Sequence, residues 1–277
     1  MIELNYGKYP IPETLKQIIS LKNQLKKEGK LSHGNLLGYY FSLADIDSRY
    51  LNTPLDVVEF ANPGADGIHF GFLTDFGQVD DLENAYIVRV SPMDFDEPVK
   101  IVARNLYDFM RMICFSPGAV EFLDIYTSET DYERLVHEIP SLSLSQIEND
   151  QQRDVNKVFQ MEFQLQPIKH IYDYLQQIKK ERMQATVLPT EDGIGVVNKK
   201  EQKQHQHFPL KRQVDLELHA VIQFFEGASY ESKLEFLRNA QSKGLLYDND
   251  EIKNYLKKKL RLMGLNDEAE RISYPEL

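Results

Sequence analysis

The chain has 277 residues, 42% of them hydrophobic and 11% aromatic, and a formal net charge of −11. This composition is typical of a folded globular protein and excludes an intrinsically disordered chain. Cys114 is the single cysteine, so no internal disulfide can form, which fits a reducing compartment. The N-terminal residues do not resemble a signal peptide, and no apolar run is long enough to span a membrane. We therefore expect a soluble, cytoplasmic protein.

The negative charge is concentrated in one part of the chain. Residues 40–140 contain 19 acidic and 6 basic residues, a net charge of −13, whereas residues 199–277 contain 13 acidic and 14 basic residues, a net charge of +1. An acidic surface repels nucleic acid and attracts cationic partners, mainly by raising the association rate. The alternative interpretation is a solvated acidic face that only keeps the protein in solution.

The first expected element is a helix over residues 12–28, because proline suits a first helical position and apolar residues recur at helical spacing up to Gly29. Residues 36–41 fit either a strand or a buried helix. A strand over residues 55–61 leads into residues 60–76, where glycine-rich turns precede a strand from Ile68 to Leu73. In that strand one face is apolar and aromatic, and His69, Gly71 and Leu73 share the other.

Strands over residues 86–90 and 99–103 follow, separated by a proline-flanked turn. Asn105 is expected to cap a helix that runs to about Phe115. Short helices between residues 118 and 138, and a long helix over residues 145–183 that Pro167 should kink or split, come next. Strands joined by short turns and followed by helices predict an α+β domain, in which helices cover one side of an antiparallel sheet.

The pattern changes after this domain. Residues 186–212 contain a weak hairpin and a run of Lys, Gln, Glu and His, which predicts a solvated linker. Residues 213–277 predict a small C-terminal helical module of three helices. Ser229 is expected to cap the second, and Asp248 with Glu251 resembles a capping box for the third. We therefore divide the chain into an α+β domain at residues 1–185, the linker, and this module, which would gain stability by docking on the first domain.

Three segments of the α+β domain together resemble the SUKH superfamily. They are the glycine-aromatic turn and strand of residues 60–76, the strand of residues 86–90 after an acidic loop, and the helix that starts at Asn105-Leu106-Tyr107-Asp108-Phe109. The likeness covers roughly residues 10–125. That superfamily groups the yeast cell-wall-synthesis regulators with many bacterial proteins.

The resemblance implies a non-enzymatic binding domain without a cofactor. Many bacterial relatives look like immunity proteins that neutralise toxins, often nucleases, by covering them, and an acidic sheet edge would suit a basic nuclease. It points to acidic residues in the turn, at the strand end and in the following connections as the partner-binding positions: Asp66, Asp75, Asp80, Asp81, Glu83, Asp94 and Asp96.

Other groups of residues have plainer interpretations. His69 with Asp75, Asp80 and Asp81 offers metal-ligand types, but no spacing matches a known motif, so we expect no metal site. Cys114 is interpreted as a small buried hydrophobe, because nothing nearby would stabilise a thiolate. The pair His205 and His207 is interpreted as a chance feature of a polar linker.

The sequence thus predicts a cytoplasmic protein that binds a basic toxin domain and blocks it by steric and electrostatic occlusion. No nucleic-acid or membrane partner is expected, and the oligomeric state is not predicted. The alternative is a regulatory scaffold or adaptor that binds partners through its C-terminal helical module. A third option is a hydrolase that uses His69 and neighbouring aspartates.

Overall fold

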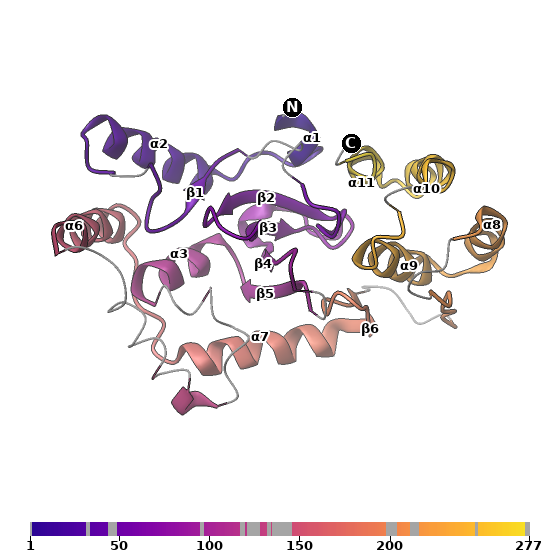
Figure 1. Ribbon diagram of the computed structural model, residues 1–277. Helices are drawn as coiled ribbons and strands as arrows, with labels where there is room; N and C mark the ends of the chain where they lie inside the picture. The colour runs from indigo at the N-terminus through magenta and orange to yellow at the C-terminus, as the bar shows by residue number, and fades with distance from the viewer. Residues whose placement is uncertain are drawn as a thin grey trace.

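A five-stranded antiparallel sheet forms the centre of the molecule (Figure 1). The computed structural model describes residues 2–31, 34–43, 49–94, 97–116, 120, 128–131, 134, 146–197, 204–210, 216–246 and 249–274. The sheet strands lie in chain order and are β1 (Tyr40–Phe41), β2 (Val57–Asn62), β3 (His69–Leu73), β4 (Tyr86–Val90) and β5 (Val99–Ala103). A separate two-stranded sheet pairs β6 (Thr186–Leu188) with β7 (Val196–Val197).

Helices lie before, between and after these strands. The N-terminal helices are α1 (Ile2–Tyr6) and α2 (Glu13–Lys27), and a 3-10 turn, η2 (Leu82–Asn84), precedes β4. The middle helices are α3 (Leu106–Phe115), α6 (Gln146–Glu162) and α7 (Ile171–Ala185). The C-terminal helices are α8 (Leu218–Gly227), α9 (Tyr230–Ser242), α10 (Asp250–Leu262) and α11 (Asn266–Arg271). The predicted α+β class with C-terminal helices is confirmed.

The first face of the sheet carries the aromatic core. Phe60 of β2 and Phe70 and Phe72 of β3 are fully buried, and the Phe60 and Phe72 rings lie 4.5 Å apart. Phe109 of α3 closes this cluster, at 5.6 Å from Phe60 and 5.0 Å from Phe70. The side chains of β3 alternate between the two faces as predicted, because successive residues of a strand point to opposite sides.

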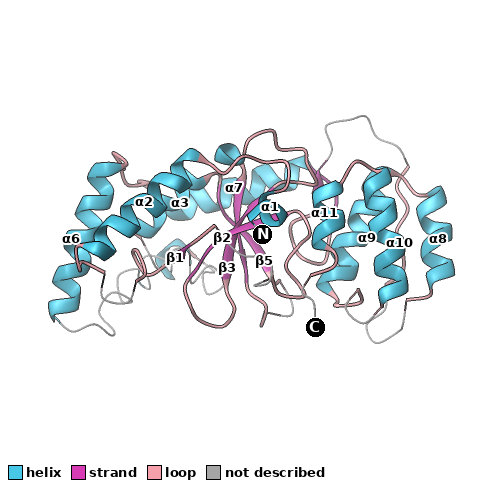
Figure 2. Cartoon of the chain, turned by 90° about the horizontal axis from the view of Figure 1, so that it is seen from above, coloured by secondary structure: helices cyan, strands magenta, loops and turns pink. Residues whose placement is uncertain are grey.

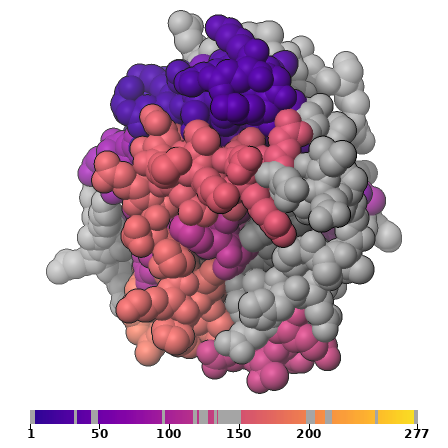
Figure 3. All heavy atoms as spheres, turned by 90° about the vertical axis from the view of Figure 1, so that its left-hand side faces the viewer, coloured from indigo at the N-terminus to yellow at the C-terminus, as the bar shows by residue number. Residues whose placement is uncertain are grey.

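Helices α2, α3 and α6 cover this aromatic face (Figures 1 and 2). Figure 3 views the molecule from the side of these helices: α2 and α6 lie side by side, and part of α3 is visible beyond them. The predicted long helix is split into α6 and α7, as expected from Pro167. The two short helices predicted between residues 118 and 138 fall largely outside the described residues.

Helix ends follow the local sequence closely. Asn105 caps α3 by accepting from Asp108 N at 2.8 Å, and Ser229 caps α9 by accepting from Ser232 N at 3.1 Å. The capping box predicted at Asp248 is not the observed cap of α10: Asn249 accepts from Ile252 N at 3.1 Å, while Asp248 lies outside the described residues. The cap and the amide that it accepts from are both shifted by one residue from the predicted pair.

The second face of the sheet is also covered, so the prediction of helices on one side was incomplete. Val57, Leu73, Val88 and Val90 form a smaller apolar layer with Ile194 of the β6–β7 turn. The C-terminal helices lie beyond this face (Figures 1 and 2). Their core includes Leu55 and Phe76 from the sheet domain. The helical module therefore shares its core with the domain on which it docks.

The segment expected to be a linker has both packed and exposed residues. The hairpin expected in it forms between β6 and β7, and Phe208 lies 5.1 Å from the Phe236 ring, whereas Gln204, Gln206 and His207 are exposed. The module also has a fourth helix, α11, whose buried Arg271 donates to Leu55 O at 2.9 Å and to Asn5 O at 2.8 Å. Among the helices in the described part of the chain, none has the length and apolar character that a membrane span requires.

Candidate partner-binding surface

The turn between β2 and β3 is shaped by two glycines. Gly64 has φ +80°, Gly67 has φ +67°, and Asp66 between them also adopts the left-handed region, at φ +53°. A Cβ atom on Gly64 would lie 2.8 Å from Cε2 of Tyr40, and one on Gly67 would lie 2.5 Å from Cζ of Tyr50. The glycines therefore supply the backbone conformation and the space that let two tyrosine rings rest on the turn.

Both tyrosine rings lie on the second face of the sheet. Tyr40 is 38% exposed, whereas its neighbours Tyr39 and Phe41 are buried in the aromatic core, so Tyr40 points to the opposite side. Tyr50 is 45% exposed and stacks on His69, with ring centroids 5.8 Å apart and an interplanar angle of 15°. His69 alternates with buried Phe70, which places Tyr50 on the same side as Tyr40.

His69 supports Tyr50, and the imidazole ring is held by hydrogen bonds within the fold. Its Nδ1 lies 2.8 Å from Gly67 O, and its Nε2 lies 3.1 Å from Oγ1 of Thr53. Because a carbonyl can only accept, Nδ1 carries the proton and Nε2 accepts from the threonine hydroxyl. Burial lowers the pKa of His69 to about 4, so the ring is neutral at neutral pH. Both ring nitrogens are thus engaged within the fold.

The loop between β4 and β5 lies at the same end of the sheet, because His69 pairs with Val90. Asn52 Nδ2 donates to Pro92 O at 3.2 Å, which ties this loop to the segment that carries Tyr50. Met93 in the loop is 68% exposed, and Asp94 accepts from Glu97 N at 3.3 Å. We call the set Tyr40, Tyr50, Asp66, Met93 and Asp94 the sheet-end surface.

The seven predicted acidic positions do not form one face. Asp66 and Asp94 lie at the sheet end described above, whereas Asp80, Asp81 and Glu83 follow β3 and lie at the opposite end. The five residues of β3 separate the two groups by roughly 16 Å, at about 3.3 Å per residue. Asp96 lies outside the described residues. These residues are close in sequence, but the extended strand between them places the two groups at opposite ends of the sheet.

Asp75 was predicted as a partner-binding residue, but it lies in the interior. Its side chain is buried, and Arg182 of α7 donates to both carboxylate oxygens, at 2.7 and 2.8 Å. Arg238 of α9 lies 3.8 Å from the same carboxylate and also pairs with Asp56 and Asp192. Asp75 is therefore part of an internal ion-pair network and does not offer its charge to a partner.

The acidic residues at the opposite end serve the local backbone. Asp81 accepts from Glu83 N at 3.0 Å and so caps η2. Glu83 accepts from Thr14 N at 2.9 Å, which satisfies a free amide in the first turn of α2. Asp80 is exposed. Two of these three carboxylates thus have a structural role in addition to their charge.

Cys114 and the two histidines of the linker region contact other side chains of the fold. Burial raises the pKa of Cys114 to about 11, and its Sγ lies 2.6 Å from Oδ1 of Asn156, so the thiol is protonated. His205 and His207 each contact α9: Nδ1 of His205 lies 3.1 Å from Oγ of Ser229, and Nδ1 of His207 lies 2.8 Å from Oε1 of Glu235.

One group in the described part of the chain combines ligand atoms suited to a cation: Glu129, His170 and Asp173, within 4.8 Å of one another. All three are exposed, and sequence spacing gave no sign of the group, because His170 and Asp173 are brought to Glu129 by the fold. Exposed carboxylates of this kind are common on protein surfaces without an ion.

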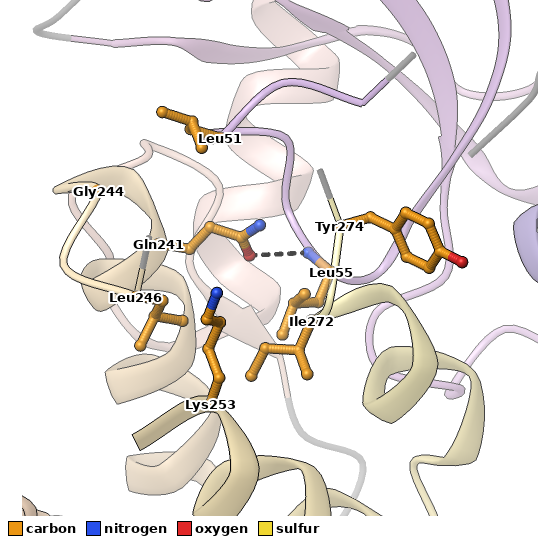
Figure 4. Close-up of a pocket in the computed structure, with 8 residues that line it drawn as sticks. All are labelled: Leu51, Leu55, Gln241, Gly244, Leu246, Lys253, Ile272 and Tyr274. Carbon is orange, nitrogen blue, oxygen red and sulfur yellow. Dashed lines mark hydrogen bonds between the residues drawn. The ribbon is translucent and has the colours of Figure 1, made fainter. Parts of the chain in front are cut away.

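A small cavity marks the junction between the C-terminal helices and the segment before β2 (Figure 4). Its volume is about 30 Å³, which is room for about one water molecule. Gln241, which lines it, accepts from Leu55 N at 3.1 Å and donates to Thr53 O. This cavity belongs to the packing between α9 and the sheet domain and is too small for an organic ligand.

The sequence missed both tyrosines of the sheet-end surface. Gly64 and Gly67 were the only indication in the sequence. A glycine in a turn or strand often lies where another group approaches closely, but it does not reveal which residue that is. Compared with known proteins, the chain matches no family model, and no curated protein matches it by sequence. The resemblance to the SUKH superfamily thus stays a prediction.

Proposed function

We propose that this chain is a non-enzymatic, cytoplasmic protein-binding domain of SUKH type, and that it acts as an immunity protein against a basic toxin domain. The sheet-end surface carries the proposal. It combines exposed tyrosine and methionine side chains, which are enriched in protein interfaces, with the carboxylates of Asp66 and Asp94.

The surface is suited to binding because much of it is fixed before a partner arrives. The Tyr50 ring is held by stacking on His69, and the Tyr40 ring rests on Gly64. Side chains that are already ordered lose less conformational entropy on association than free ones do. The surrounding acidic charge would accelerate encounter with a cationic partner, and this effect would weaken as salt is added.

Neutralisation would follow from coverage alone. A partner whose basic active-site groove meets the sheet-end surface would lose access to its anionic substrate. No step of this mechanism needs a chemical reaction by the chain itself. The shared core of the sheet and the C-terminal helices would supply the rigid support on which the surface is displayed.

A co-expression assay tests the proposal. The protein encoded next to this chain is produced alone and together with it, and cell growth is followed. We expect the neighbour to stop growth and the chain to restore it. Asp66→Lys should abolish rescue, whereas Asp80→Lys, an equal charge change at the opposite end, should retain it. A neighbour that is harmless alone, or rescue that survives Asp66→Lys, would contradict the proposal.

Deletion of residues 210–277 would not be a clean test of the adaptor alternative. Such a deletion would uncover Leu55 and Phe76 and leave Asp56 without Arg238, so it would damage the first domain as well. A surface change on the module is cleaner. Leu262 of α10 is 81% exposed, and loss of partner binding in Leu262→Glu but not in Asp66→Lys would favour the adaptor.

A further inference from the structure

The two tyrosines of the sheet-end surface each have one side covered and one side open. One face of the Tyr50 ring is stacked on His69, and an edge of the Tyr40 ring lies against Gly64. Tyr50 is 45% exposed and Tyr40 is 38% exposed. Asp66 is exposed and lies in the turn between the two glycines on which the rings rest. An aromatic face beside a carboxylate attracts a cation through the ring quadrupole and the negative charge together.

The same combination, filled by an arginine, occurs elsewhere in the described part of the chain, and two examples involve a tyrosine ring. The guanidinium of Arg104 lies 4.8 Å from the Tyr174 ring centre and pairs with Glu181 at 2.9 and 3.1 Å. The guanidinium of Arg111 lies 6.0 Å from the Tyr107 ring centre and donates to Asp108 at 2.8 Å. A ring, a carboxylate and a guanidinium therefore form a recurrent unit in this fold.

The sheet-end surface has the ring and the carboxylate without the guanidinium. Among the residues that the structure describes, no lysine or arginine lies over Tyr40 or Tyr50, and none pairs with Asp66. Within the described residues this unit therefore lacks its cation, and a binding partner can supply it. An anionic group is disfavoured here, because the exposed carboxylate of Asp66 would repel it.

We propose that the sheet-end surface recognises an arginine side chain of the partner, which lies against the rings of Tyr40 and Tyr50 and pairs with Asp66. This inference rests on the proposed function, since it names the group that the partner presents. Arginine is preferred over lysine because its planar guanidinium stacks on an aromatic face and can pair with both oxygens of a carboxylate.

An NMR titration of the full chain with N-acetyl-arginine-methylamide tests the inference directly. We expect saturable shifts of the Tyr40 and Tyr50 ring signals, with a dissociation constant on the order of 10 mM for a single unanchored side chain. The lysine analogue should bind at least threefold more weakly. Asp66→Asn should weaken arginine binding at least fivefold, and asparagine tolerates the left-handed backbone of this position.

Matched variants make the outcome decisive. Asp80→Asn removes an exposed charge at the opposite end of the sheet and should leave the titration unchanged. Shifts that grow linearly without saturation, or that are equal in Asp66→Asn, would overturn the inference. Equal binding of the lysine analogue would overturn the choice of arginine. Growth rescue that depends on Asp66, in the absence of arginine binding, would retain the proposed function and reject this inference alone.

Discussion

At Gly67, a tyrosine ring occupies the space that any side chain would need. The position has φ +67° and a Cβ would lie 2.5 Å from the Tyr50 ring, so two separate penalties apply to a substitution. Gly29, after α2, has a similar φ of +70° and nothing within 4 Å of a Cβ. A comparison of substitutions at Gly67 and Gly29 therefore separates the cost of the backbone conformation from the cost of the contact with the Tyr50 ring.

We predict that Gly67→Ala destabilises the protein more than Gly29→Ala does. Left-handed backbone costs an alanine about 1–2 kcal/mol at either site. Displacement of the exposed Tyr50 ring should add up to about 1 kcal/mol at Gly67, because the ring would lose its stacking on His69. Urea unfolding of both variants measures the difference. Equal losses of stability would mean that Tyr50 does not rest on the turn as described.

Glu268, at the start of α11, makes stability depend on pH. Burial raises the pKa of its carboxyl from 4.5 to about 7, although Arg271 nearby acts in the opposite direction. Between these two pH values the folded protein keeps a proton that the unfolded chain has released. Unfolding then releases a proton, so the contribution of Glu268 to stability is full below about pH 4.5 and is lost as the pH rises to 7.

The variant Glu268→Gln should remove this dependence. Glutamine has no proton to lose, so we expect the variant to be more stable than the parent protein at pH 8 by up to roughly 3 kcal/mol. The two proteins should differ little at pH 4. Denaturant unfolding at both pH values provides the measurement. A stability difference that is the same at pH 4 and pH 8 would contradict the assigned pKa.

At the scale of elements, α9 holds the C-terminal helices to the sheet through Arg238. Its guanidinium pairs with Asp56 before β2, at 2.5 Å, and with Asp192 in the β6–β7 turn, at 3.1 Å. Arg182 of α7 pairs with Asp75 next to this group. All of these side chains are buried. Their mutual pairing is what makes burial of several charges tolerable.

We predict that Arg238→Met lowers the free energy of unfolding by about 3–5 kcal/mol, because it leaves the carboxylates of Asp56 and Asp192 buried without a counter-charge. The double variant Arg238→Met with Asp56→Asn should recover part of the loss. As a control, Lys16→Met removes an exposed pair with Glu13 and should cost about 0.5 kcal/mol or less. Urea unfolding distinguishes these variants. A loss at Arg238 as small as that at Lys16 would refute the bridging role of α9.

The elements themselves were largely predictable, since their signals are local. The periodic apolar residues predicted where helices lie. The caps at Asn105 and Ser229 and the break at Pro167 were also predicted correctly. Residues 69–73 alternated as expected. The ion-pair network was not predictable, because Asp56, Asp75 and Arg238 come from distant segments that meet through the fold. For the same reason, a charged residue in a turn could not be assigned to the surface or the interior from its neighbours.

At the scale of the whole molecule, the predicted acidic positions are divided between the two ends of the sheet. The sequence analysis grouped them as one partner-binding set, but β3 carries Asp66 to one end and Asp80 to the other. Only the Asp66 end combines carboxylates with exposed tyrosines and a methionine within the described residues. This asymmetry leads us to place the partner at that end.

Site-specific photo-crosslinking in the cells that carry the gene tests this placement most directly. Met93 in the sheet-end surface and Met183 on α7 are both 68% exposed, so a benzoylphenylalanine at either position is equally accessible. We predict that position 93 captures one basic protein that is toxic when produced alone, and that position 183 captures none. Capture of that protein from position 183 but not from position 93 would show that the partner binds elsewhere.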